Sequence, residues 1–148
     1  MSSRRHIHVM TVGEVSGPLR ASITRSTFDE MIASFERDRG DLLGVPNALP
    51  IYLGIDHRYN ADCIEACVDG WVFRLWHRYD GQLWASVELS DRAEAGLVQK
   101  KWPFCSAAFY MQHRDAETGE CLGAKLIELS FCDHALPIAG RIDTSELV

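Results

Sequence analysis

The sequence predicts an α+β fold: a mostly antiparallel β-barrel of about six or seven strands, with two or more helices packed outside it. Three observations lead to this fold class. Segments with strand-like patterns outnumber helical ones, tight turns join most of them, and a few segments carry the apolar spacing of amphipathic helices. Strands that are joined by hairpins pair antiparallel, and such sheets commonly curl into barrels.

The expected strands are short apolar runs, or they alternate apolar and polar residues between turn signals. Residues 82–89 show the alternation most clearly: every second residue from Leu83 to Leu89 is apolar, while Trp84 and Ser86 point to the opposite face. A Tyr-Asp-Gly turn signal precedes this strand and indicates a hairpin. The expected strands are residues 6–10, 51–55, 68–76, 82–89, 104–113 and 121–132, and loops are expected at 13–18 and 42–50.

Two helices are expected. The first has an N-cap at Ser26, ends near Gly40 and carries one apolar face, formed by Phe28, Met31, Ile32 and Phe35. The second spans residues 91–101, is capped by Ser90 and is ended by Pro103. Its inward residues are expected to be Ala93, Leu97 and Val98.

Length and composition indicate one soluble globular domain. The 148 residues are 47% hydrophobic and 24% charged, which is typical of a folded domain at residues 1–140, followed by a loose polar tail at 141–148. The net charge of −6, without a basic stripe, argues against a nucleic-acid partner. There is no apolar stretch of about 18 residues and no signal-peptide pattern, so we expect no membrane partner and no export.

The five cysteines are expected to be reduced thiols, because their number is odd and no export signal is present. Cys63 and Cys67 lie four residues apart and could join His57 in a thiol or metal hydrolase. Small buried apolar side chains are the favoured interpretation, since free cysteine packs as a small hydrophobe. We therefore expect no metal and no organic cofactor.

Three residues are candidates for chemistry. His57 follows an expected buried strand, where it could act as a general base or be an ordinary loop histidine. Ser106 is followed by Ala107 and Ala108, which leave space around a nucleophilic hydroxyl, although it could simply be a strand serine. Glu128 lies inside an apolar strand, where a buried carboxylate needs a partner.

The hairpin between the last two long strands links two of these candidates. A turn centred on Glu117 places Ser106 directly opposite Glu128, with Cβ atoms about 4.5–5.5 Å apart. A one-residue slip would put them on opposite faces. Together with His57 they suggest a serine–histidine–carboxylate triad, in which His134 competes for the third role. A dyad of Ser106 with a lysine of the pair 100–101 is the weaker alternative.

Several blocks follow one another in a distinctive order. The chain has an N-terminal strand, a glycine-containing loop and an amphipathic helix, followed by a histidine block, a serine block and a closing strand. Ile23-Thr24 leads into the helix, and Asp56-His57-Arg58-Tyr59 is the histidine block. Gly70-Trp71-Val72 and residues 83–88 follow it. The serine block is residues 101–109, and the closing strand is residues 126–130.

In this order and spacing, the blocks resemble the phage prohead (capsid maturation) serine proteases, including the Mu-type protease–scaffold proteins, which are distant relatives of herpesvirus assemblin. The resemblance runs from about Ile7 to Ala139. The family usually has a Pro-Ala pair after the closing strand, where this chain has Asp133-His134-Ala135. The herpesvirus relatives use a second histidine in that region, so His134 stays an alternative to Glu128. We expect this sequence to be the protease domain alone or a stand-alone form, without the scaffold extension that is often fused to such proteases.

The resemblance implies a serine endopeptidase that cleaves scaffold protein, major capsid protein and itself, inside the assembling procapsid in the host cytoplasm. Ser106 would be the nucleophile, His57 the base and Glu128 the third member, with backbone N–H groups and Arg141 supporting the oxyanion. A homodimer is expected, with the helix at residues 26–39 as the candidate contact; the alternative is that the apolar face of this helix packs on the chain's own barrel. The alternative is a non-enzymatic component of procapsid or virion assembly that uses the barrel for binding.

Overall fold

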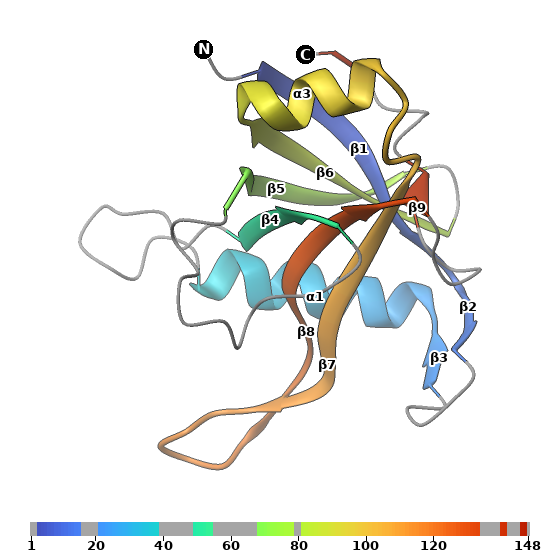
Figure 1. Cartoon of the computed structure of the whole chain (residues 1–148). Coiled ribbons are helices and arrows are strands. Elements are labelled where there is room, and N and C mark those ends of the chain that lie inside the picture. Colours follow the sequence, from blue (N-terminus) through green and yellow to red (C-terminus); the bar gives the residue numbers. More distant parts are fainter. Residues whose placement is uncertain are drawn as a thin grey trace.

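An eight-stranded sheet forms the framework of the molecule and curls around an apolar core (Figure 1). The computed structural model describes residues 3–15, 21–38, 49–54, 68–78, 81–133, 140–141 and 146–147. In sheet order the strands are β10 (Glu146–Leu147), β1 (Ser3–Thr11), β6 (Gln82–Leu89), β5 (Gly70–Arg78), β4 (Leu49–Leu53), β8 (Cys121–Cys132), β7 (Phe104–Arg114) and β9 (Gly140–Arg141).

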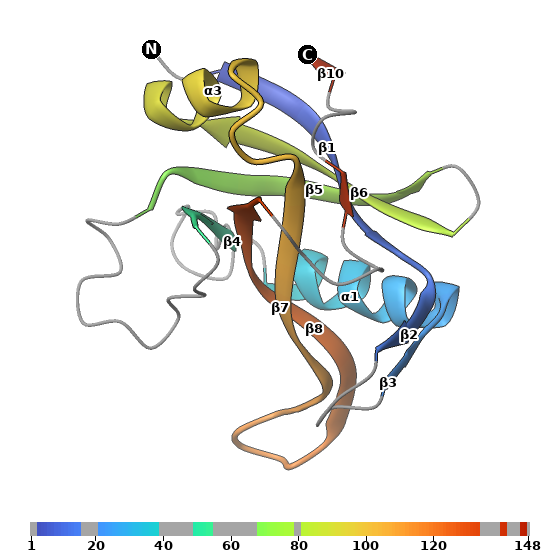
Figure 2. The same cartoon turned by 45° about the vertical axis from the view of Figure 1, so that its right-hand side comes forward.

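Neighbouring strands of this sheet are antiparallel except for β4 and β8, which run parallel. A separate hairpin of β2 (Gly13–Val15) and β3 (Ala21–Ile23) leads into helix α1 (Arg25–Asp38). The second helix, α3 (Asp91–Val98), follows β6. The two helices lie at opposite ends of the curled sheet (Figures 1 and 2), and both contribute to its core. Neither described helix is long and apolar enough to span a bilayer.

The expected fold class is confirmed, with more strands than expected. The bounds of β6 and β8 agree with the sequence prediction. The four strands that the pattern missed are only two or three residues long, too short for any periodicity to show: β2, β3, β9 and β10. The sequence also indicates a loose tail for residues 141–148, but β10 within it pairs with β1.

The sheet closes where β9 meets β1. A Cβ atom at Gly140 would lie 1.8 Å from the backbone oxygen of His8, so only glycine fits between these two strands. On its other side, β9 pairs with the start of β7, where Gly140 is opposite Cys105. This close backbone approach makes the curled sheet barrel-like and fixes the end of β9 beside the start of β7.

Helix α1 packs its apolar face onto the sheet. Phe28 and Met31 are fully buried and belong to the common core. The helix begins two residues earlier than expected, because Thr24, not Ser26, caps it: the Thr24 hydroxyl accepts the N–H of Thr27 at 3.3 Å. The apolar face therefore packs on the chain's own sheet, and the expected dimer contact through this helix stays a prediction.

Helix α3 is shorter than expected; of its three predicted inward residues, Ala93 is buried and Leu97 packs against the core, but Val98 does not. The Ser90 hydroxyl caps it as predicted, by accepting the N–H of Ala93 at 3.1 Å. It ends at Val98 because Lys100 adopts a left-handed φ of 57° and Lys101 donates its N–H to Gly96 at 2.9 Å, which is a Schellman end. The ring of Trp102 packs on Gly96, so Val98 is exposed rather than inward.

The two faces of β6 are both buried, which the alternating pattern did not predict. Trp84 and Ser86 lie on the face opposite to the core, yet both are about as buried as the core residues. The Arg78 guanidinium lies 4.4 Å from the centre of the Trp84 ring, and His8 stacks on the same ring. Long side chains from the neighbouring strands therefore cover this face.

Replacing Gly140 with alanine should destabilise the fold by more than about 3 kcal/mol, because the added Cβ meets backbone that cannot rotate away. Gly119→Ala is the matched control. Gly119 has a left-handed φ of 73° but open space around it, so alanine there should cost only about 1–2 kcal/mol. Denaturant unfolding measures both, and equal losses would contradict the proposed closure of the sheet.

Candidate active site

Three strand ends meet at one end of the sheet (Figure 2). Strands β4 and β8 are parallel, so their carboxyl ends lie together, at Leu53 and Phe131. Strand β7 is antiparallel to β8, so its amino end, at Phe104, lies beside the carboxyl end of β8. Leu53, Phe131 and Phe104 therefore lie at the same end of the sheet, although they are distant in sequence.

Ser106 lies in a polar row that crosses these three strands. It is directly opposite Ser130 on β8, and Ser130 is in turn paired with Tyr52 on β4. Opposed residues in a sheet point to the same face, so all three side chains lie on the face away from the core. Tyr52 and Ser130 are buried, whereas Ser106 is partly exposed. Ser106 is thus the accessible member of the row.

Ser130 ties the end of β4 to this row. Its hydroxyl donates to the backbone oxygen of Gly54, and the N–H of Gly54 donates to the backbone oxygen of Phe131 at 2.8 Å. These two bonds hold the chain against β8 just after β4 ends. They fix the starting point of the segment that carries His57.

The register of the β7–β8 hairpin differs by two residues from the one expected. Glu128 lies opposite Ala108, not opposite Ser106. The turn closes between Asp115 and Glu120, half a residue later than a turn centred on Glu117. The rest of the difference comes from an extra residue in β8 at Ile127. Because the shift is even, Ser106 and Glu128 keep the same face, as diagonal neighbours about 7–8 Å apart.

The extra residue forms a β-bulge that decides which way Glu128 points. Ala108 pairs with Glu128, but the next residue of β7, Phe109, pairs with Leu126, which leaves Ile127 unmatched. A regular strand continuing from the Phe109–Leu126 pair would place Glu128 opposite Ala107, on the face of the apolar core. The bulge instead turns this fully buried carboxylate to the face of Ser106.

The remaining candidate residues lie outside the described part of the chain, wholly or in their side chains. His57 follows Gly54 by three residues, and His134 directly follows Asp133 at the end of β8. The backbone of Arg141 belongs to β9 and pairs with Phe104, two residues before Ser106. In the sequence, each of these candidates thus belongs to a strand that reaches this sheet end or follows one by two to four residues.

The alternative groups are placed less favourably. Lys100 and Lys101 are exposed at the end of α3, and the Lys101 ammonium lies 5.0 Å from the centre of the Trp102 ring. Within the described residues, no three His, Cys, Asp or Glu side chains are grouped so that they could bind a metal. The proposed thiol or metal site of Cys63, Cys67 and His57 lies outside these residues.

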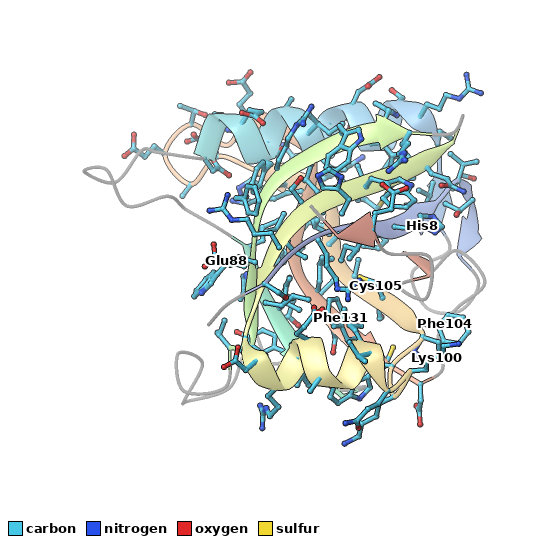
Figure 3. The ribbon with its side chains drawn as sticks, turned by 90° about the horizontal axis from the view of Figure 1, so that it is seen from above. His8, Glu88, Lys100, Phe104, Cys105 and Phe131 are labelled. Carbon is cyan, nitrogen blue, oxygen red and sulfur yellow. The ribbon has the colours of Figure 1, made fainter. Side chains whose placement is uncertain are left out.

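Cys105 precedes Ser106 but points the other way, into the core beside Phe131 (Figure 3). Burial raises the pKa of its thiol strongly, and the nearby Cys132 thiol raises it further. The described cysteines, Cys105, Cys121 and Cys132, all carry thiols, and only Cys121 is exposed. Cys105 is thus a core residue and a poor nucleophile.

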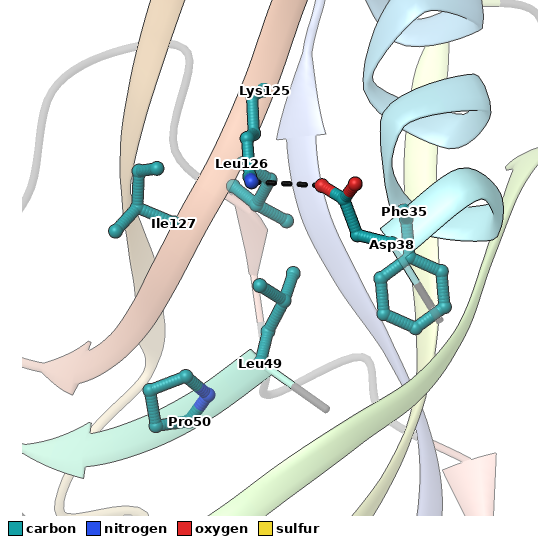
Figure 4. Close-up of a pocket in the computed structure, with 7 residues that line it drawn as sticks. All are labelled: Phe35, Asp38, Leu49, Pro50, Lys125, Leu126 and Ile127. Atoms are coloured by element: carbon teal, nitrogen blue, oxygen red, sulfur yellow. Dashed lines mark ion pairs between the residues drawn. The ribbon is translucent and has the colours of Figure 1, made fainter. Parts of the chain in front are cut away.

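A pocket of about 250 Å³ lies beside the bulge, between the end of α1 and the start of β4 (Figure 4). At its rim, the Lys125 ammonium lies 2.7 Å from a carboxylate oxygen of Asp38. Burial raises the pKa of Asp38, but the hydrogen bonds and charges of Lys125 and Arg37 outweigh it and hold the pKa below its ordinary value. Its described lining contains neither Ser106 nor Glu128, so the pocket is separate from the candidate site.

The comparison with protein families identifies the chain. A family model described as Mu-like prophage I protein, N-terminal domain, matches residues 7–134. The chain therefore belongs to this Mu-like phage protein family, which confirms the Mu-type resemblance and a phage-related role. The link to herpesvirus assemblin stays a resemblance. A search of curated proteins and a search of solved structures gave no match.

Sequence reasoning missed Ser130 and Tyr52. Ser130 could have been found, since it is two residues from Glu128 and therefore on the same face of an expected strand. Tyr52 gave no such signal, because its pairing with β8 is a parallel contact between strands far apart in the chain. Hairpin arithmetic cannot predict a pairing of that kind.

In the folded protein, iodoacetamide should modify Cys121 much faster than Cys105 or Cys132, because only the Cys121 thiol is exposed. Peptide mass spectrometry locates the label, and denatured protein, in which all thiols react, is the control. Equal labelling of Cys105 and Cys121 without denaturant would show that the residue beside Ser106 is not in the core.

Proposed function

We propose that the protein is a serine endopeptidase that processes proteins of a phage procapsid, with Ser106 as its nucleophile. One observation carries this proposal: the partly exposed Ser106 shares a sheet end with the strands that lead to His57 and His134. Membership of a Mu-like phage protein family supports the phage setting. The protease activity itself is our inference from the arrangement and from the resemblance.

In the proposed reaction, the Ser106 hydroxyl attacks the scissile carbonyl while the imidazole of His57 takes its proton. The imidazolium then gives that proton to the leaving amine, and water releases the acyl group from Ser106 by the reverse sequence. His57 is within chain reach of this position, since three extended residues after Gly54 span up to about 10–11 Å. The Ser130–Gly54 bond supports a fixed origin for that segment.

Glu128 is our proposed third member, which orients the imidazole and stabilises its charged form. Its carboxylate is fully buried on the face of Ser106, where a cationic partner would offset the cost of burying the charge. His134, which follows Asp133 at the same sheet end, is the alternative third member. Glu128 lies inside the sheet, two residues further from the sheet end than Ser130, the residue opposite Ser106.

The developing oxyanion requires hydrogen-bond donors close to Ser106. Backbone N–H groups near Ser106 are the proposed donors, and Arg141 is a proposed support. The pairing of Arg141 with Phe104 favours this role, since it brings the β9 backbone next to the start of β7.

The proposed substrates are scaffold protein, the major capsid protein and the protease itself, cleaved inside the assembling procapsid in the host cytoplasm. A homodimer is the proposed assembly. No metal or organic cofactor takes part in the proposed reaction.

Replacing Ser106 with alanine should reduce cleavage of co-expressed capsid and scaffold proteins by several orders of magnitude, because the nucleophile is lost. Ser26→Ala, an exposed serine in the first turn of α1, is the matched control and should cleave normally. Mass spectrometry of the new chain ends measures both. Unchanged cleavage by the Ser106 variant, or no cleavage by the unmodified protein, would contradict the proposal and favour a binding role.

Glu128→Gln should lower the cleavage rate by about a hundredfold or more while the melting temperature changes little, because glutamine keeps the shape but not the charge. His134→Ala should have the smaller effect. If the loss in the His134 variant is the greater, the third member is His134 and our assignment of Glu128 is wrong.

A further inference from the structure

The C-terminal strand β10 pairs with β1 along the edge opposite to the one that β6 occupies. Its two residues form an antiparallel ladder in which Glu146 is opposite His6 and Leu147 is opposite Arg5. The Glu146 carboxylate reaches across the outer face of the sheet to Arg78 on β5 and accepts two hydrogen bonds, at 2.8 and 2.9 Å. A backbone ladder and a forked charge pair together recognise this short acidic segment.

The Arg78 side of this contact is held in place by its surroundings. Its guanidinium lies 4.4 Å from the centre of the Trp84 ring, and the indole N–H of Trp84 donates to the Gln82 side chain at 2.8 Å. The hydrogen bonds from Arg78 lower the pKa of Glu146, so the pair is charged at neutral pH. The sheet thus carries a built site for a glutamate in an extended segment.

The hold on β10 is nevertheless small. Among the described residues, two of the C-terminal segment join the ladder, and the side chain of Glu146 is 43% exposed. Partly exposed ion pairs contribute little to stability, and such edges open locally far more often than the core. When β10 leaves, the edge of β1 and the guanidinium of Arg78 can bind another extended segment that carries a glutamate at the same position.

We propose that this site also accepts the C-terminal strand of a second copy of the chain, so that two copies exchange β10 reciprocally. The segment that would be exchanged is Glu146–Leu147. In the structure it occupies the site of its own chain, and every other copy carries the same segment. Exchange of this kind reproduces existing contacts and needs no new surface. Four residues join β9 to β10, so each chain's own β10 has a high effective concentration at its own site. Exchange between copies therefore requires concentrated protein or a weakened contact within the chain.

Charge reversal in the full-length chain tests the exchange. In Arg78→Glu the chain's own Glu146 is repelled, and in Glu146→Arg the mutated strand is repelled by Arg78. Mixing the two variants gives opposite charges at both sites of an exchanged heterodimer. We expect the mixture to form heterodimers with a dissociation constant at least about tenfold below that of either variant alone, measured by sedimentation velocity and native mass spectrometry.

Arg74→Glu mixed with Glu146→Arg is the matched control. Arg74 is also on β5 and lies 4.9 Å from the centre of the Trp76 ring, but the fork that holds Glu146 is Arg78. This mixture should give no heterodimer, and the double variant Arg78→Glu with Glu146→Arg should return to a monomer. If Glu146→Arg does not fold, Glu146→Lys offers the same charge. No heterodimer in the first mixture, with both variants folded, would overturn the proposal.

Discussion

The β-bulge at Ile127 is the constraint on which the candidate site depends, because it sets the direction of every side chain in β8 beyond it. On the hairpin side of the bulge, Leu126 faces the core together with α1, and on the other side Leu129 and Phe131 do so. The extra residue lets both stretches contribute to one apolar core and still leaves Glu128 and Ser130 on the outer face. Without it, a carboxylate would face the apolar core, at a cost of several kcal/mol. Bulges often redirect a side chain next to a functional site in this way.

The parallel pairing of β4 with β8 is the second constraint on the candidate site. It brings Gly54 to the end of the sheet where β7 begins, and the hydrogen bonds of Gly54 to Ser130 and Phe131 hold it there. Strand β9 completes this end from the far side of β7. A nucleophile on a rigid strand can then meet groups carried by segments that leave the neighbouring strands. Function placed at the ends of well-packed strands is a common arrangement, since the scaffold positions it while the connecting segments vary.

The sequence was sufficient for the long elements, because β6, β8 and α1 carry clear periodicity or turn signals. It also placed Ser106 and Glu128 on one face, although the register behind that prediction was displaced by two residues. A bulge cannot be read from a pattern of alternation, and here its effect combined with a shifted turn to restore the face. The row of Tyr52, Ser130 and Ser106 depends on a parallel contact between distant strands, and the small strands β9 and β10 are too short to show any period. These features arise from tertiary contacts, such as the fit of Gly140 against β1.

We propose that Ser106 and His57 meet on the outer face of the sheet end. An X-ray structure of the protein after reaction with diisopropyl fluorophosphate tests this most directly, because the reagent marks an activated serine and the structure shows its surroundings. We expect the phosphorus to be bonded to Oγ of Ser106, with a ring nitrogen of His57 at hydrogen-bond distance, about 2.6–3.2 Å. The Glu128 carboxylate should lie on the same face. Phosphorus on a different residue, or a His57 ring turned away from the modified Ser106, would contradict the account.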